Sequence, residues 1–92
     1  MIIKYIAYYR QDTGRKAETL DLAPMTALDL LRYLSQRHGE KLAGHLLYRG
    51  GEDIHKQVIF LLNGRNIDFL DGSRTIVGRD DEVSLFPRIA GG

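Results

Sequence analysis

The chain has 92 residues, of which 43% are hydrophobic and 27% charged, a size and composition typical of one small globular domain. Thirteen Lys and Arg against twelve Asp and Glu give a net charge of +1, a basic excess too small to indicate nucleic acid or a membrane surface as a partner. The lack of cysteine excludes disulfides and thiolate sites, and the lack of a long apolar run or signal-peptide pattern leads us to expect a cytoplasmic protein.

The N-terminal part of the sequence predicts a β-hairpin. Residues 2–9 are dense in β-branched and aromatic side chains, which favour strands. Residues 17–22 alternate apolar and polar side chains with period two. A polar cluster that ends at Gly14 separates these two runs, so we expect antiparallel strands joined by a short turn.

A helix is predicted over residues 27–38. Apolar side chains and one histidine recur there at the spacing of a single helical face, at Ala27, Leu30, Leu31, Leu34 and His38. Thr26 precedes the first of them and is predicted to be the N-cap residue, with Asp29 three positions later. Gly39 follows two cationic side chains and provides the left-handed residue that commonly ends a helix.

The second half of the sequence predicts three more strands. Residues 41–48 fit a short second helix that ends before Gly50, and residues 58–62 form a continuous apolar run followed by an Asn-Gly turn. Such a run indicates a strand covered on both faces, either by the fold or by a partner. We expect a short strand around residues 66–69 and a last strand over residues 82–86.

This order of elements predicts an α+β fold, a mixed sheet of four to five strands with one main helix packed on one face. The first and last strands are expected to be neighbours in its middle. Residues 1–92 form one domain in this prediction, with a flexible C-terminal tail over residues 87–92.

Alternation along the first and last strands predicts the two faces of the sheet. We assign to the core the residues Ile3, Tyr5, Val83 and Leu85, together with Leu30, Leu31 and Leu34 of the helix. Phe86, Pro87 and Ile6, with one face of residues 58–62, are then left as an apolar patch for a partner.

The residue patterns of common catalytic sites are missing from this sequence. His38, His45 and His55 lack a spacing with carboxylates that would build a metal site. None of the serines lies in a nucleophile elbow, and neither type of glycine-rich phosphate loop is present. The acidic run Asp80-Asp81-Glu82 is interpreted as a solvated turn before a strand and not as a pair of catalytic carboxylates. We therefore expect a protein that is not itself an enzyme.

The C-terminal pair Gly91-Gly92 is the one feature that indicates chemistry. Two residues without side chains can enter a narrow channel and adopt any backbone conformation that an active site demands. Their reactive group is the terminal carboxylate, which is ionised at neutral pH and a poor electrophile. Another enzyme must therefore activate it, for instance as an acyl-adenylate.

The ending Asp81-Glu82-Val83-Ser84-Leu85-Phe86-Pro87-Arg88-Ile89-Ala90-Gly91-Gly92 resembles the D-x-V-x-x-F-P-P-V-A-G-G ending of the small subunit of molybdopterin synthase and its sulfur-carrier relatives. Asn63-Gly64-Arg65-Asn66, followed by Leu70-Asp71-Gly72, is similar to a turn of the same family. The resemblance implies a ubiquitin-like β-grasp fold.

The resemblance also implies how such a protein works. An activating enzyme adenylates the carboxylate of Gly92 with ATP, and the end is then converted to a thiocarboxylate that donates sulfur. Arg88, Ile89, Ala90 and Gly91 lie in the channel of that enzyme, and the chain itself binds no cofactor. The sulfur acceptor implied is the large subunit of molybdopterin synthase, or another acceptor.

Arg88 departs from the family pattern, which has a second proline there. It restores a backbone N–H and adds a charge, which makes the ending more like the arginine-rich tails of ubiquitin-type modifiers. Three alternatives therefore stay open: a modifier joined through Gly92 to lysines, a sulfur carrier for cysteine or thiamin synthesis, and a β-grasp interaction module without covalent chemistry. Molybdopterin synthesis is favoured over thiamin synthesis because thiamin-pathway carriers are typically shorter.

Overall fold

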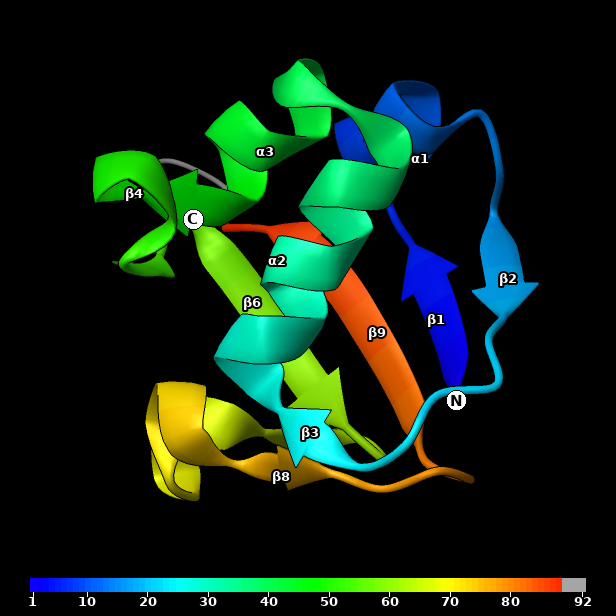
Figure 1. Cartoon of the computed structure of the whole chain (residues 1–92), viewed down its shortest axis with the longest axis vertical. Coiled ribbons are helices and arrows are strands. Elements are labelled where there is room, and N and C mark those ends of the chain that lie inside the picture. Colours follow the sequence, from blue (N-terminus) through cyan, green and yellow to red (C-terminus); the bar gives the residue numbers. More distant parts are fainter. Residues whose placement is uncertain (89–92) are drawn as a thin grey trace.

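The computed structural model describes residues 1–88, and a mixed five-stranded sheet forms its centre (Figure 1). In spatial order its strands are β2 (Ala17–Thr19), β1 (Ile2–Tyr5), β9 (Glu82–Pro87), β6 (Val58–Leu62) and β7 (Arg65–Asn66). β1 and β9 pair in parallel, and the other neighbours are antiparallel. The predicted central pair of first and last strands is confirmed.

Helix α2 (Ala27–His38) lies across one face of this sheet, in front of β9 in Figure 1. The Thr26 hydroxyl accepts a hydrogen bond from the backbone N–H of Asp29 at 3.1 Å, as the sequence predicts. Gly39 ends the helix with a φ of 106°, a value that favours glycine. Helix α3 (Glu40–Leu46) follows at once and confirms the second helix expected in this region, although it ends two residues before the predicted end, because Leu47 and Tyr48 form a strand.

Short elements extend the fold beyond the central sheet. β3 (Met25–Thr26) pairs with β8 (Ile76–Val77), and β4 (Leu47–Tyr48) pairs with β5 (Asp53–Ile54) around the turn η1 (Arg49–Gly51). Two further 3₁₀ turns are η2 (Ile67–Phe69) and η3 (Gly72–Arg74). Within residues 1–88, no helix has both the length and the apolar character that a membrane span requires.

The core lies between α2 and the sheet, and the predicted assignment of faces holds there. Every side chain assigned to it is fully buried: Ile3, Tyr5, Val83 and Leu85 from the strands, and Leu30, Leu31 and Leu34 from the helix. Period-two alternation accounts for the strand residues, because each is separated from the next by an exposed or partly exposed side chain.

The N-terminal hairpin differs from the prediction in its connection. β1 ends at Tyr5, and residues 8–13 form helix α1 (Tyr8–Thr13) instead of continuing the strand. Ala7 interrupts the strand with a φ of 57°, and the helical turn that follows buries Tyr9 completely in the core. Tertiary burial of an aromatic side chain thus overrides the local strand preference. β2 also ends early, at Thr19 instead of Leu22.

Two further boundaries are corrected. The expected strand around residues 66–69 is the two-residue β7 followed by the 3₁₀ turn η2, because the Asn66 side chain accepts a hydrogen bond from the N–H of Asp68 at 2.9 Å. The Asn63-Gly64 turn is confirmed, with φ values of 50° and 84°. The last strand includes Pro87, which lies opposite Val58, so it extends one residue beyond the predicted end.

Candidate functional site

The end of β9 carries the chain to the predicted functional terminus. β9 is paired on both sides, with β1 and with β6, so its direction is fixed by two ladders of hydrogen bonds. Beyond Pro87, the backbone N–H of Arg88 donates to the carbonyl of Gln57 at 2.7 Å. We call this point the tail root. The predicted channel residues Ile89, Ala90 and Gly91 and the predicted reactive residue Gly92 lie outside the described residues.

An apolar patch lies beside the tail root on the face of the sheet opposite α2. Phe86 is partly exposed, lies opposite Ile59 of β6, and is next to Ile6, whose N–H donates to Leu85. Ile6 is 38% exposed and Ile59 is half-buried. We call these three residues the open-face patch. The predicted exposure of Phe86 and Ile6 is confirmed.

Pro87 was also expected in this patch, and that prediction is wrong. Pro87 is buried, because it continues the inward-facing series of Val83 and Leu85 along β9. Proline is tolerated at this last position of the strand, where a missing N–H removes little pairing. Pro87 therefore holds the tail root from the core side and does not present a surface to a partner.

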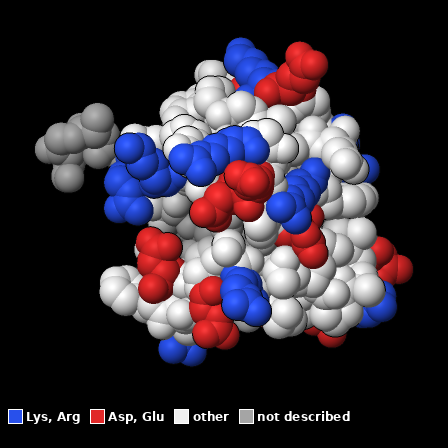
Figure 2. Space-filling model, turned by 60° about the vertical axis from the view of Figure 1, so that its left-hand side comes forward, with Lys and Arg blue, Asp and Glu red and all other residues white. Residues whose placement is uncertain are grey.

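A hollow of about 440 Å³ lies on the other side of the tail root. Its walls include Lys56, Val58, Phe60, Asp68, Ser73 and Arg88. The guanidinium of Arg88 is 3.9 Å from the Asp68 carboxylate, a loose ion pair between two exposed groups. Figure 2, which brings this side forward, shows basic and acidic side chains interspersed on the surface rather than a patch of one sign.

Asp53 and Ile54 of β5 line this hollow and belong to the β4–β5 hairpin, whose structure the sequence left open. Arg32 of α2 donates a 2.6 Å hydrogen bond from Nε to the carbonyl of Gly51 and so holds the turn of this hairpin. Tyr48 is half exposed on the hairpin, and the Arg49 guanidinium lies 5.3 Å from the centre of its ring. The tail root is therefore flanked by the open-face patch on one side and by a hollow with charged side chains in its walls on the other.

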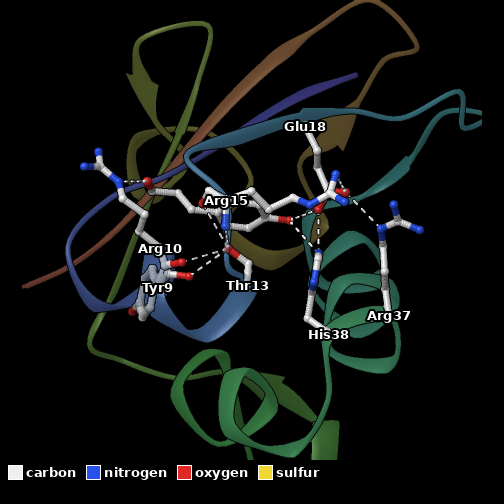
Figure 3. Close-up of polar contacts among 8 residues, drawn as sticks. Tyr9, Arg10, Thr13, Arg15, Glu18, Arg37 and His38 are labelled. Carbon is white, nitrogen blue, oxygen red and sulfur yellow. Dashed lines mark hydrogen bonds and ion pairs between the residues drawn. The ribbon is translucent and has the colours of Figure 1, made fainter.

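A buried polar cluster centred on Glu18 is the feature that sequence reasoning missed (Figure 3). Its carboxylate accepts from the Tyr5 hydroxyl at 2.5 Å, from His38 Nε2 at 2.5 Å and from Arg37 Nε at 2.9 Å. Arg15 adds a longer ion pair at 3.6 Å. The cluster joins the edge strand β2 to the last turn of α2.

The electrostatics of this cluster follow from its contacts. Burial by itself raises the pKa of Glu18, but the hydrogen bonds from Tyr5, His38 and Arg37 outweigh it, and the net pKa lies below the usual value. Burial, the hydrogen bond to Glu18 and its negative charge all raise the pKa of Tyr5. Both oxygens of Glu18 are occupied and its side chain is 2% exposed, so the cluster fixes structure and cannot reach a substrate.

One pattern in the sequence does indicate this cluster. Alternation over residues 17–22 places Glu18 on the same face as Leu20, and a charged side chain on an apolar face requires partners. The partners come from distant elements, so the sequence does not identify them. A second pair of this kind joins α1 to α3, where His45 Nδ1 lies 2.5 Å from the buried Asp12 carboxylate. Residues 1–88 contain no group of three side chains suited to hold a metal.

Comparison with known proteins places these features in context. Residues 3–92 match the model of the ThiS family. Small archaeal modifier protein 3 of Haloferax volcanii is 34% identical over 91 residues, which cover 98% of this chain and 96% of that protein. A protein of Archaeoglobus fulgidus, provisionally named a sulfur carrier protein, is 37% identical over 73 residues, covering 79% of this chain and 81% of that protein.

Solved structures are also similar. The HVO 2177 protein of Haloferax volcanii superposes with a TM-score of 0.78 at 34% identity, over 99% of this chain and 84% of that one. Small archaeal modifier protein 1 of Methanosarcina acetivorans gives a TM-score of 0.78 at 24% identity, over 99% of this chain and 94% of that one. The mixed sheet, the helix across it and these likenesses confirm the ubiquitin-like β-grasp fold.

Proposed function

The chain belongs to the ThiS family of ubiquitin-like sulfur carriers, and from this premise we propose that it carries sulfur as a thiocarboxylate on Gly92. The observation that carries this proposal is the family match, which extends over residues 3–92 and so includes the Gly-Gly ending. The position of the tail root supports it. β9 brings the chain from the centre of the sheet directly to the last residues before that ending.

The chemistry proposed for Gly92 follows from the properties of a carboxylate. An activating enzyme transfers AMP from ATP to the carboxylate, and pyrophosphate leaves. Hydrosulfide released by a sulfur donor then attacks the carbonyl carbon, AMP leaves with the electron pair of the broken C–O bond, the sulfur loses its proton, and a thiocarboxylate remains. The chain supplies no thiol for these steps because it has no cysteine, so the sulfur is carried on the terminal carbon itself.

The open-face patch beside the tail root is the surface that we propose for partner binding. A partner that accepts the tail in a channel must approach β9 at its end, where it meets the open-face patch of Ile6, Ile59 and Phe86. Apolar side chains there provide contact area, and the partly exposed aromatic ring of Phe86 suits an anchor in a partner's pocket. The partners we propose are the adenylating enzyme and the protein that receives the sulfur.

Molybdopterin synthesis is the destination that we propose for the sulfur, with the large subunit of molybdopterin synthase as acceptor. Its support is the resemblance of residues 81–92 to the ending of the small subunit of that enzyme. A second function, conjugation through Gly92 to lysines of other proteins, is favoured by one specific observation. A relative that is 34% identical over nearly the whole chain is named a modifier protein.

Deleting Gly92 tests the use of the terminal carboxylate. ATP-dependent formation of an acyl-adenylate, followed as pyrophosphate exchange in an extract of the source cells, should fall to background for the deletion variant. Extending the chain by one residue should have the same effect, because the reactive carbon is displaced from the activating site. Circular dichroism and the melting temperature serve as controls and should match those of the unaltered chain. Full exchange activity in the deletion variant would contradict the proposal.

A further inference from the structure

We propose that Arg15 and Arg37 form a binding site for a phosphate group, either inorganic phosphate or the phosphate of a phosphomonoester. Both arginines lie on the solvent side of the Glu18 cluster, between the start of β2 and the last turn of α2. The carboxylate of Glu18 itself cannot reach a ligand, but the two guanidiniums beside it can. β1 separates β2 from β9, so this site is distinct from the tail root.

The two arginines share one oxygen of a buried carboxylate. Oε1 of Glu18 lies 2.9 Å from Nε of Arg37 and 3.6 Å from Nη1 of Arg15. These two nitrogens are therefore at most roughly 6.5 Å apart, a separation at which like charges repel each other. The other oxygen, Oε2, is occupied on the core side by Tyr5 and His38. A second anion, bound on the solvent side of the two guanidiniums, would relieve their repulsion.

The charges around Glu18 do not balance. One carboxylate faces two guanidiniums, and the negative end of α2 offsets only about half a charge more. A positive excess remains even when the His38 ring is neutral. Elsewhere in residues 1–88, each ion pair of a lysine or arginine joins one cation to one carboxylate: Lys4–Glu82, Arg32–Asp29, Arg79–Asp21 and Arg88–Asp68. Within the described part of the chain, a carboxylate shared by two arginines is thus found at Glu18 alone.

Both guanidiniums retain hydrogen-bond donors for a ligand. Each has five N–H groups, and within residues 1–88 Glu18 is the one partner that either guanidinium contacts. The side chains of Arg15 and Arg37 are 51% and 38% exposed, so their remaining donors reach solvent. In Figure 3 both side chains converge on Glu18, and the backbone N–H of Arg15 also donates to the Thr13 hydroxyl at 3.3 Å. Donors that are already held in place lose less conformational entropy when a ligand binds.

This arrangement suits a phosphate group better than a carboxylate. A planar guanidinium donates two parallel N–H groups to a phosphate, and a tetrahedral anion has enough oxygens to accept from two guanidiniums at once. A phosphomonoester carries about 1.5 to 2 negative charges at pH 7, whereas a carboxylate carries one. A nucleic acid strand is a poor match, because the net charge of the whole chain is only +1. The ligand that we propose is therefore a single phosphate group, which would also strengthen the link between β2 and α2.

The test is an NMR titration of the full chain with inorganic phosphate and, separately, with glycerol 2-phosphate, at about pH 7.5 and constant ionic strength. The Nε–H signals of Arg15 and Arg37 should shift and saturate. Arg15→Gln should weaken binding at least ~5-fold, because a charge-assisted contact is lost. The matched control Arg74→Gln removes the same charge from an exposed position in η3 and should change affinity less than ~2-fold. Acetate should bind at least ~5-fold more weakly than either phosphate, because it has one charge.

Three results would overturn this inference: no saturable shift with either phosphate compound, equal weakening by Arg15→Gln and Arg74→Gln, or acetate binding as tight as phosphate binding. Equal weakening would mean that the chain responds to net charge and not to a site. Arg15→Gln should keep the fold, because its 3.6 Å ion pair is exposed on one side, and circular dichroism checks this. Arg37→Gln is a second variant and should weaken binding as well. Neither result bears on the chemistry proposed for Gly92.

Discussion

Phe86 is the residue on which the proposed partner contact depends most. It lies between the buried residues Leu85 and Pro87 on the opposite face of β9, and its ring is partly exposed beside Ile6 and Ile59. The sequence predicts this exposure because strand side chains alternate between two faces. The same rule places Pro87 on the buried face. The sequence did not predict this burial because proline was expected to lie beyond the end of the strand.

Phe86→Ala should weaken binding to the large subunit of molybdopterin synthase by roughly 30- to 1000-fold, the usual cost of about 2–4 kcal/mol for removing an aromatic anchor. Titration calorimetry measures this change. Ile76→Ala is the matched control, because Ile76 is 59% exposed on β8, outside the central sheet, and should leave affinity unchanged. A large fall in melting temperature for Phe86→Ala would instead show that the ring serves the core.

At the scale of elements, the accuracy of prediction follows the range of the interactions. α2 is predicted from its N-cap to its final glycine because the signals at its two ends are local. Thr26 and Asp29 interact within the first turn, and Gly39 acts at the last turn. α1 is not predicted, since Tyr8 and Tyr9 favour a strand locally and the four residues after them are typical of a polar turn, whereas the helix buries Tyr9 in the core. Local pattern and tertiary packing agree in the first case and conflict in the second.

The link between β2 and α2 likewise cannot be predicted from the local sequence pattern. Glu18 collects hydrogen bonds from Tyr5, Arg37 and His38, which are 13 to 20 residues away in the sequence. β2 is a three-residue edge strand with one neighbouring strand, so we infer that this cluster supplies much of what holds it in place.

The pH dependence of stability tests this inference. The pKa of Glu18 is lowered in the folded chain from an ordinary value of 4.5, so its stabilising contribution is complete above that value and is lost as the pH falls through the lower folded value. Glu18→Gln should cost roughly 2–4 kcal/mol of unfolding free energy at pH 7, because buried donors lose a charged acceptor. The difference from the unaltered chain should be complete from pH 7 down to about pH 5 and should shrink as the pH falls below 4.5. Urea unfolding across this range measures it, and a constant difference would exclude the role assigned to Glu18.

At the scale of the whole molecule, the central pair β1–β9 explains how a small fold presents a chain terminus. β9 enters the middle of the sheet and leaves it at Pro87, with the open-face patch on one side and the 440 Å³ hollow on the other. The sequence predicts the central pair of strands and the exposure of Phe86 and Ile6, which follow from element order and alternation, but it does not predict the order of the other strands. It does not predict the hollow, whose walls come from β5, β6, the two 3₁₀ turns η2 and η3, and the tail root together.

The account as a whole depends on the identity of the group at Gly92. Intact-mass spectrometry of the protein purified from its own cells tests it most directly, because exchange of one oxygen for sulfur adds about 16 Da. We predict a free chain that carries this added mass, located at Gly92 by tandem spectra and removed when the purified chain is incubated with a sulfur acceptor. A free chain of unaltered mass, accompanied by Gly-Gly remnants on lysines of other proteins, would contradict the sulfur-carrier account and identify the chain as a modifier.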